Sequence, residues 1–182
     1  MDIFTNLPSE EFPKSKVDEI RSRHMNKFVS ISNPSVKDLN DANLLFQQEI
    51  NDERKKYLSS IRKERKKISE ENERIFLSDP VGCINYIQSH KNYPSFSIGE
   101  ILQLYGIGKS TIKRFGKGTL VGKGSDYPYI RSNFNVTAQI GVHQFEENIC
   151  GSNDKRSKDD LVTMVLEKLA LRISKMAGDK ND

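Results

Sequence analysis

The sequence predicts a mainly α-helical protein with a small β-hairpin, and three observations carry this prediction. Residues 35 to 76 contain neither proline nor glycine, which favours one long helix. Near the C-terminus, apolar residues recur at the four- and three-residue spacing of an amphipathic helix. Between these helices, "TLV" and "YPYIR" flank the turn-forming run "GKGSD", which is typical of a β-hairpin.

Composition limits the class of protein before any motif is considered. The chain has 182 residues, of which 35% are hydrophobic and 30% charged, with a net charge of +4 and a pI of about 9.0. The basic balance indicates a polyanionic partner. No apolar run reaches the ~20 residues of a membrane span. Cys83 and Cys150 are isolated and the three histidines are scattered, so we expect neither a disulfide framework nor a zinc site.

The first 78 residues divide into two predicted segments. Residues 1–34 carry three prolines and are expected to be loosely ordered, with a short helix around Val17 to Val29. Residues 35–78 form the long basic helix, with Ser35 as its cap. A partial heptad seam through Ile61, Ile68 and Ile75 allows a coiled coil. The seam is interrupted by charged residues, so this helix either packs on its own domain or projects to form a dimer.

Residues 79–150 are predicted to form a domain of short helices followed by strands. Asp79 and Pro80 suit the N-cap and first position of a helix that runs to about Lys91. Ser97 and Glu100 match the S-x-x-E capping box, so a second helix is expected from Ile98 to Tyr105. The glycines of Gly106-Ile107-Gly108 would then form a turn, with a third helix beginning at Lys109. After the hairpin, "NVTAQIGVHQF" alternates in the manner of a further strand.

The run "GIGKST" has competing interpretations. A phosphate-binding loop of the form GxxxxGK[ST] needs a glycine at position 103, where this chain has Gln103. The capping box also places a helix where that loop requires a preceding strand. A helix-turn-helix, a helix-hairpin-helix that grips phosphate through backbone amides, and an ordinary core helical hairpin all remain open.

The stretch "SIGEILQLYGIGKSTIKRF" resembles the helix-turn-helix of bacterial and phage DNA-binding proteins, among them excisionase-like and site-specific recombinase types. The resemblance covers residues 97 to 115 and no more of the chain. The hairpin that follows suits the wing of a winged helix-turn-helix. The shorter run "LYGIG" is also similar to the "IYGIG" hairpin of a small-subunit ribosomal protein family, which favours the helix-hairpin-helix alternative.

The helix-turn-helix interpretation predicts a DNA-binding surface. The helix from Lys109 would enter the major groove, with Ser110 and Arg114 as base readers. The hairpin and the long helix would hold phosphates. The complete set of expected DNA-binding residues is Lys109, Ser110, Thr111, Lys113, Arg114, Lys117, Lys123, Arg62, Lys63, Lys66 and Lys67. The basic cluster that supplies the last four runs from Arg54 to Lys67.

The C-terminal segment, residues 151–182, is expected to be a polar linker followed by a self-association helix. Its apolar seam consists of Val162, Leu166, Leu169, Ile173 and Met176. A helix that packs on its own core and one that pairs with a second copy fit this spacing equally well.

These features predict a sequence-specific protein that binds double-stranded DNA, acting as a transcription regulator or as a plasmid or phage replication or partition factor. We expect a homodimer through the long or the C-terminal helix, located in the cytoplasm with the nucleoid, or in a nucleus. No set of residues indicates catalysis, a metal or another cofactor. The alternatives are a binder of RNA or DNA backbone and a helical assembly or scaffold subunit.

Overall fold

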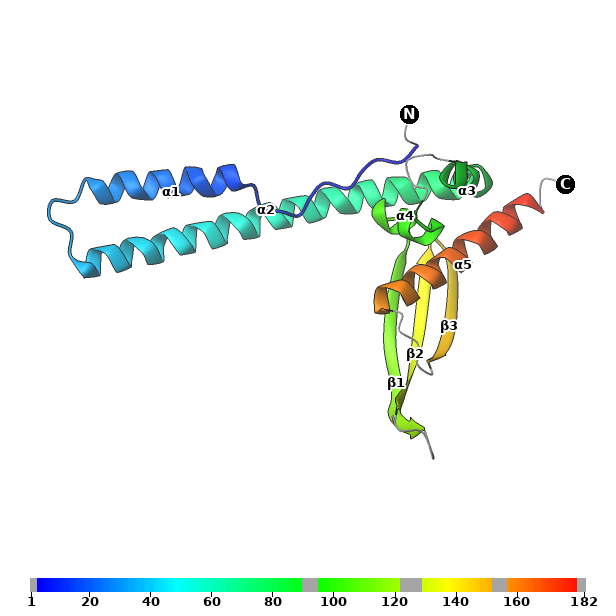
Figure 1. The fold of residues 1–182 in the computed structure, drawn as a ribbon. Helices are drawn as coiled ribbons and strands as arrows, with labels where there is room; N and C mark the ends of the chain where they lie inside the picture. Colours follow the sequence, from blue (N-terminus) through cyan, green and yellow to red (C-terminus); the bar gives the residue numbers. More distant parts are fainter. Residues whose placement is uncertain (1–2, 90–94, 122–128, 152–156, 180–182) are drawn as a thin grey trace. The chain divides into compact units, whose positions relative to one another are not determined.

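The computed structural model describes residues 3–89, 95–121, 129–151 and 157–179. For residues 114–121, 129–133 and 150–151 it describes the backbone alone. Within these ranges the chain is mainly helical and has one three-stranded antiparallel sheet (Figure 1). It divides into two compact units, one of residues Pro8–Lys66 and one of Met1–Leu7 with Lys67–Asp182. None of the described helices is both long and apolar enough to cross a membrane.

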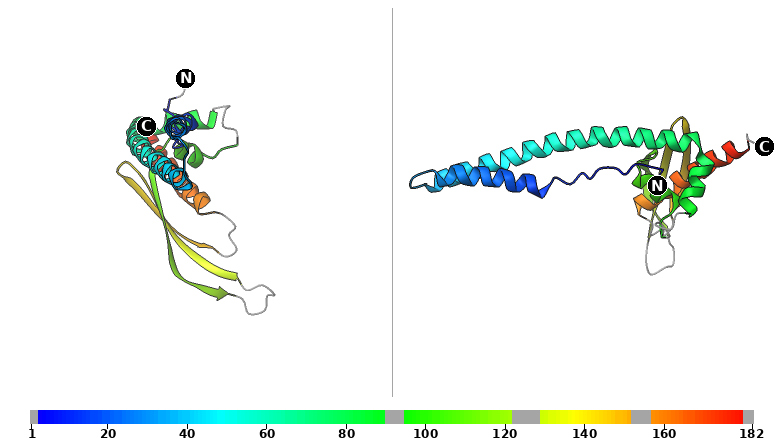
Figure 2. Two further views of the ribbon diagram at one scale, coloured as in Figure 1. Left: turned by 90° about the vertical axis from the view of Figure 1, so that its left-hand side faces the viewer. Right: turned by 90° about the horizontal axis from the view of Figure 1, so that it is seen from above.

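The unit Pro8–Lys66 is an antiparallel helical hairpin. Helix α1 (Lys14–Val29) runs back along the first part of helix α2 (Val36–Ser78), as Figures 1 and 2 show. Ser35 caps α2 as predicted. Its hydroxyl accepts from the Asp38 N–H at 3.2 Å, while the Asp38 carboxylate accepts from the Ser35 N–H at 2.8 Å. This reciprocal pair satisfies backbone donors that the first turn of a helix leaves without intrahelical partners.

The residues before α1 pack along α2. The Phe12 ring meets the Tyr57 ring edge-on, with centroids 5.5 Å apart. Arg65 donates to the Pro8 carbonyl at 2.6 Å and forms an ion pair with Glu10 at 3.0 Å. The short helix expected around Val17 to Val29 is therefore present as the 16-residue helix α1. The residues just before it, which were expected to be loosely ordered, are bound to α2.

The second unit is built on the sheet of β1 (Lys109–Val121), β2 (Tyr129–Ile140) and β3 (His143–Gly151), in the order β1-β2-β3. Helix α5 (Lys158–Gly178) packs against one face of this sheet (Figure 1). Because side chains alternate along a strand, Val136, Ala138 and Ile140 of β2 all lie on that covered face and are buried.

Helix α5 buries most of the apolar seam that the sequence indicated. Leu166, Leu169 and Ile173 are buried in the core of the second unit, Val162 packs against it, and Met176 is 46% exposed. The seam therefore packs on its own domain, which is one of the two alternatives the spacing allowed. It does not offer a continuous open face for a second copy.

Two short helices complete this core. Helix α3 (Pro80–Ser89) begins as predicted, because the Asp79 carboxylate accepts from the Gly82 N–H at 2.8 Å. Helix α4 (Ile98–Leu104) has the predicted capping box of Ser97 and Glu100. The apolar sides of both helices are buried, including Ile84, Ile87, Ile101 and Leu102.

The predicted helix from Lys109 is wrong, and a winged helix-turn-helix core is not confirmed. Gly106 and Gly108 do form a turn, with φ of 68° and 82°, conformations that glycine adopts without steric cost. The chain leaves this turn as strand β1, whose residues pair with β2 from Lys109 opposite Gln139 onward. The backbone groups of this segment are therefore satisfied by a neighbouring strand rather than within a helix.

The predicted pairing of the hairpin strands is confirmed and is longer than expected, whereas the turn-forming run at residues 122–126 lies outside the described residues. Leu120 pairs with Ile130 and Val121 with Tyr129, in the two runs that the sequence indicated. The expected further strand "NVTAQIGVHQF" is divided between β2 and β3, because the chain turns at Gly141, where φ is 56°. The sheet therefore has the three strands that were expected, but β2 joins the second of them to the first half of the third, and β3 begins only at His143.

A buried asparagine joins the N-terminal segment to the core of the second unit. Asn72 of α2 is fully buried, and its side-chain amide bonds three backbone groups. Its oxygen accepts from the Thr5 N–H at 2.9 Å, and its nitrogen donates to the carbonyls of Thr5 and Tyr105 at 2.8 and 2.9 Å. Phe4 beside it is buried, with its ring centroid 5.2 Å from that of Tyr105.

Candidate nucleic-acid interface

The basic cluster of α2 separates into residues with structural partners and residues that face solvent. Arg65 is bound to Pro8 and Glu10, and the Arg54 guanidinium lies 5.9 Å from the Phe12 ring centroid. Lys55 and Lys56 make exposed ion pairs one turn back, with Asp52 at 3.6 Å and Glu53 at 2.9 Å. Exposed pairs of this kind contribute little to stability, so their lysines can change partner.

Four of the expected phosphate-holding residues are exposed on α2: Arg62, Lys63, Lys66 and Lys67. In the part of the chain that the structure describes, Arg62 and Lys63 make no hydrogen bond or ion pair. Exposed cations without an acidic partner can bind phosphate oxygens without first breaking an ion pair.

Lys55, Arg62, Lys63 and Lys66 line a shallow hollow of about 470 Å³ together with Leu58 and Ser59. We call these four cations the basic face. Relative to Ser59 they stand at positions i−4, i+3, i+4 and i+7, which lie on one side of a helix. The hollow is therefore lined by four cations and by one residue with a hydroxyl group, Ser59. Glu64, the one acid between residues 54 and 67, lies about half a helical turn from Lys55 and Lys66.

The nearest aromatic residue of α2 does not belong to the basic face. Tyr57 packs against Phe12, its hydroxyl donates to the Ser9 carbonyl at 3.3 Å, and Lys16 lies 5.7 Å from its ring centroid. Its ring is thereby occupied within the hairpin. The basic face offers charge and a hydroxyl group, without the aromatic stacking surface on which single-stranded bases are usually held.

The expected DNA-binding residues of the first part of β1 lie on the two faces of the sheet rather than along one helix. Lys109, Thr111 and Lys113 are exposed, in register with Gln139, Thr137 and Asn135 of β2. Ser110 alternates with them and lies opposite Ala138, on the face that α5 covers. The major-groove helix that would present these side chains together is absent.

Among the side chains that the structure describes, those on the open face of the sheet are polar and carry little net charge. Beside Lys109 and Lys113 it carries amides and hydroxyls, and Glu146 of β3, which accepts from the side chain of Asn135. The same Asn135 amide donates to Asn148 at 3.0 Å. With two cations and one acid among its described side chains, this face is a weaker anion-binding surface than the basic face, which has four cations.

Three further expected residues cannot be placed as side chains. Arg114 and Lys117 belong to strand β1, and their side chains lie outside the described part of the chain. Lys123 lies outside the described residues. Their proposed contacts with DNA remain predictions from the sequence.

The described part of the chain shows neither a reactive thiol nor a cluster of metal ligands. Cys83 is buried, and burial together with the nearby Asp79 carboxylate raises the pKa of its thiol to about 11, which keeps it protonated at neutral pH. No cluster of three or more histidine, cysteine, aspartate or glutamate residues suited to a metal ion occurs among the described residues.

An ionic group joins α1 to α2 in the hairpin. Glu49 of α2 bonds His24 Nε2 at 2.6 Å and Arg23 at 2.9 Å. The hydrogen bond with His24 is the main cause of a pKa for Glu49 below its usual value, opposed by partial burial and aided by Arg23. The carboxylate form is therefore the one that the folded hairpin favours.

The Glu49 group predicts an acid-sensitive hairpin. A carboxylate whose folded pKa is lowered stabilises the fold above its unfolded pKa, and that contribution is lost as the pH falls through the folded pKa. We expect Glu49→Gln to increase amide hydrogen exchange in α1 at pH 7 relative to the unchanged chain. The difference between the two proteins should shrink as the pH falls through the folded pKa of Glu49, because protonation removes the charge that the Glu49→Gln variant lacks. A difference that does not change as the pH is lowered would show that the charge is not the cause.

Comparison of the chain with protein-family models, with curated proteins and with solved structures finds no match.

Proposed function

We propose that this protein binds duplex nucleic acid by its phosphate backbone, with the basic face of α2 as the contact surface. The observation that carries the proposal is the grouping of Lys55, Arg62, Lys63 and Lys66 on the side of α2 that carries Ser59. Phosphate oxygens accept hydrogen bonds from Arg, Lys and Ser side chains, and such contacts supply most of the sequence-independent affinity for nucleic acids.

The dimensions of the basic face suit a duplex. From Lys55 to Lys66 the helix rises about 16 Å at ~1.5 Å per residue. The same length of duplex DNA axis carries about ten phosphate charges on its two strands. Four cations on one rigid helix can therefore engage several phosphates without rearranging the backbone of the protein.

In this proposal the protein contacts the phosphate backbone of the nucleic acid and does not recognise the bases. The segment expected to read the major groove is strand β1, and the aromatic ring nearest the basic face is held by Phe12. These two facts favour a duplex held by charge and shape over a sequence-selected or single-stranded target. The expected double-stranded DNA is one such duplex, and duplex RNA presents the same phosphates.

A role in transcription, or in plasmid or phage replication or partition, requires that the chain prefer DNA to RNA. A duplex partner also places the protein in the cytoplasm with the nucleoid, or in a nucleus. The proposal includes no catalytic step, metal or cofactor. The expectation of a homodimer is kept, with its contact surface on the hairpin rather than on α5.

Fluorescence anisotropy with labelled oligonucleotides tests the proposed function. The full chain should be titrated into two unrelated duplex DNA sequences, a duplex RNA, and a single strand of one of them. We expect the two DNA duplexes to bind within about threefold of each other and the single strand to bind more weakly. Absence of binding at low salt, or a preference for one DNA sequence of about 1,000-fold, would refute backbone binding as the function.

A further inference from the structure

The helical hairpin buries very little of its own apolar surface. Within Pro8–Lys66, which the structure describes in full, Ile20 of α1 and Ile50 of α2 are buried, and the other apolar side chains retain part of their exposure. A pair of helices covers only one side of each apolar stripe, so hairpins of this size usually pack against a further layer.

Exposed apolar side chains are concentrated at the closed end of the hairpin. Among the described residues, eleven large apolar side chains are exposed, and seven of them fall between positions 25 and 45: Met25, Val29, Ile31, Val36, Leu39, Leu44 and Leu45. Exposed apolar residues scattered singly are ordinary in proteins, whereas a concentration of this kind marks an interaction surface.

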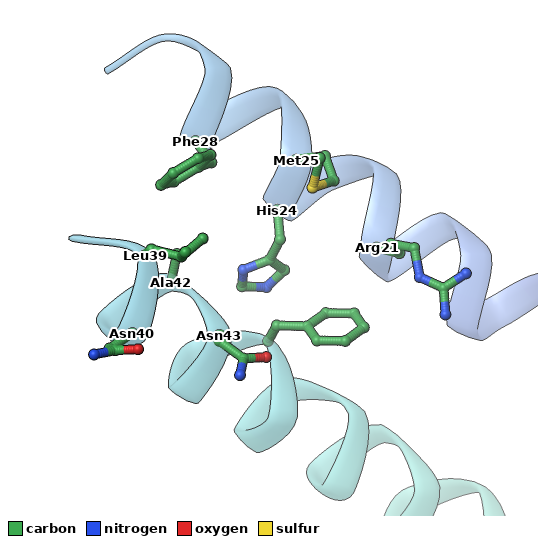
Figure 3. Close-up of a pocket in the computed structure, with 9 residues that line it drawn as sticks. Arg21, His24, Met25, Phe28, Leu39, Asn40, Ala42 and Asn43 are labelled. Carbon is green, nitrogen blue, oxygen red and sulfur yellow. The ribbon is translucent and has the colours of Figure 1, made fainter. Parts of the chain in front are cut away.

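A groove of about 460 Å³ runs between α1 and α2 within this region (Figure 3). Met25 and Phe28 line it from α1, and Leu39, Ala42 and Phe46 line it from α2. Figure 3 shows His24 pointing from α1 toward α2, with Phe28 and Leu39 at the closed end. The groove is mainly apolar, and its polar rim includes Arg21, Asn40 and Asn43. Met25 and Leu39 remain 55% and 54% exposed.

We propose that a second copy of this chain occupies the groove, so that two hairpins form a four-helix bundle. The contact is isologous, with Met25 and Leu39 of each copy entering the groove of the other. The bundle supplies the second layer that the hairpin lacks, and it covers apolar side chains that are more than half exposed in one copy.

The charges of the hairpin end favour a second copy over a partner of opposite charge. Between positions 25 and 45 the chain carries two lysines, Lys27 and Lys37, and two aspartates, Asp38 and Asp41. Arg21, which also lines the groove, adds one positive charge, so this surface carries about +1 in a chain whose net charge is +4. An acidic partner would be drawn to the more strongly charged basic face instead, whereas two ends of such low charge approach each other with little repulsion.

Sedimentation equilibrium of the full chain without nucleic acid tests the proposal independently of the proposed function. We expect the unchanged protein to be a dimer at micromolar concentration. Met25→Glu/Leu39→Glu should raise the dimer dissociation constant at least about 100-fold, because the contact would bury carboxylates without partners. Both positions are more than half exposed, so helicity by circular dichroism should not change. The matched control is Leu104→Glu, at a residue of α4 that is 50% exposed, which should remain dimeric.

A cross-linking experiment locates the contact. Asn43 is exposed on the rim of the groove, so Asn43→Cys should give a covalent dimer with a short bismaleimide above the level of the unchanged chain. Adding Met25→Glu/Leu39→Glu should remove that product. A chain that stays monomeric at about 100 µM, or a dimer that both glutamates leave intact, would overturn the proposal.

Discussion

Arg62→Glu/Lys63→Glu should weaken binding to duplex DNA by about 100-fold or more at low salt. Both side chains are exposed on α2, and within the described chain neither has a hydrogen bond or ion pair that the substitutions would break. Each change removes a phosphate contact and places a carboxylate where a phosphate would lie. The measurement is the dissociation constant by fluorescence anisotropy, with helicity checked by circular dichroism.

A variant with the same change in net charge separates local contact from overall charge. Lys27 and Lys37 are exposed at the closed end of the hairpin, and Lys37 precedes Lys55 by about 27 Å of helix at ~1.5 Å per residue; Lys27→Glu/Lys37→Glu also lowers the net charge by four. We expect it to weaken binding by less than about fivefold, since exposed charges beyond a Debye length are screened. If both variants lost affinity equally, the binding would depend on net charge, and the basic face would not be the contact surface.

Asn72→Leu should lower the free energy of unfolding of the second unit by about 3 kcal/mol, because it leaves buried backbone groups without partners. Asn72 is 0% exposed and bonds the Thr5 N–H, the Thr5 carbonyl and the Tyr105 carbonyl. Leucine is similar in size but can replace none of these bonds. Urea unfolding followed by circular dichroism measures the change, and hydrogen exchange should show faster exchange at Thr5.

The control for Asn72 is a second asparagine of the same unit. Asn85 is exposed on α3, so Asn85→Leu changes the same chemical groups without affecting a buried backbone donor. Its effect should stay within about 0.5 kcal/mol, as is usual at exposed positions. A stability loss for Asn72→Leu no larger than that of Asn85→Leu would show that water or a rearranged backbone replaces the missing bonds.

Local signals in the sequence predicted the helices whose beginnings depend on neighbouring residues. Ser35 with Asp38, Asp79 with the Gly82 N–H, and Ser97 with Glu100 are caps formed within four residues, and all three occur in the structure. Such interactions depend on the chain nearby and need no knowledge of the tertiary fold. The apolar spacing of α5 predicted its helix for the same reason, although it did not indicate which part of the protein the apolar face would contact.

Strand β1 was misread because the information that decides it lies elsewhere in the chain. "KSTIKRF" contains lysines and an arginine that favour helices as well as the β-branched Thr111 and Ile112. Its pairing partners are residues 129–139, and that pairing satisfies its backbone. Asn72 was missed for a similar reason, since its partners Thr5 and Tyr105 are 67 and 33 positions away.

The sequence located the basic cluster but could not sort its members. The sequence alone does not distinguish the roles of the eight basic residues between positions 54 and 67. The structure assigns Arg54 and Arg65 to the residues that precede α1, because Phe12, Pro8 and Glu10 lie against them. Arg62, Lys63 and Lys66 are left exposed on the side of α2 that carries Ser59. This division depends on how the first residues of the chain fold back, which helical periodicity does not reveal.

The salt dependence of duplex DNA binding tests the central claim most directly. Each neutralised phosphate contributes about −0.9 to the slope of log K against log salt concentration, so four contacts from the basic face predict a slope of about −3.6. Replacing Arg62, Lys63 and Lys66 by glutamine should reduce the slope to about −1, since Lys55 would remain. An unchanged slope in the glutamine variant, with the unchanged chain still binding, would place the phosphate contacts on another surface and contradict this account.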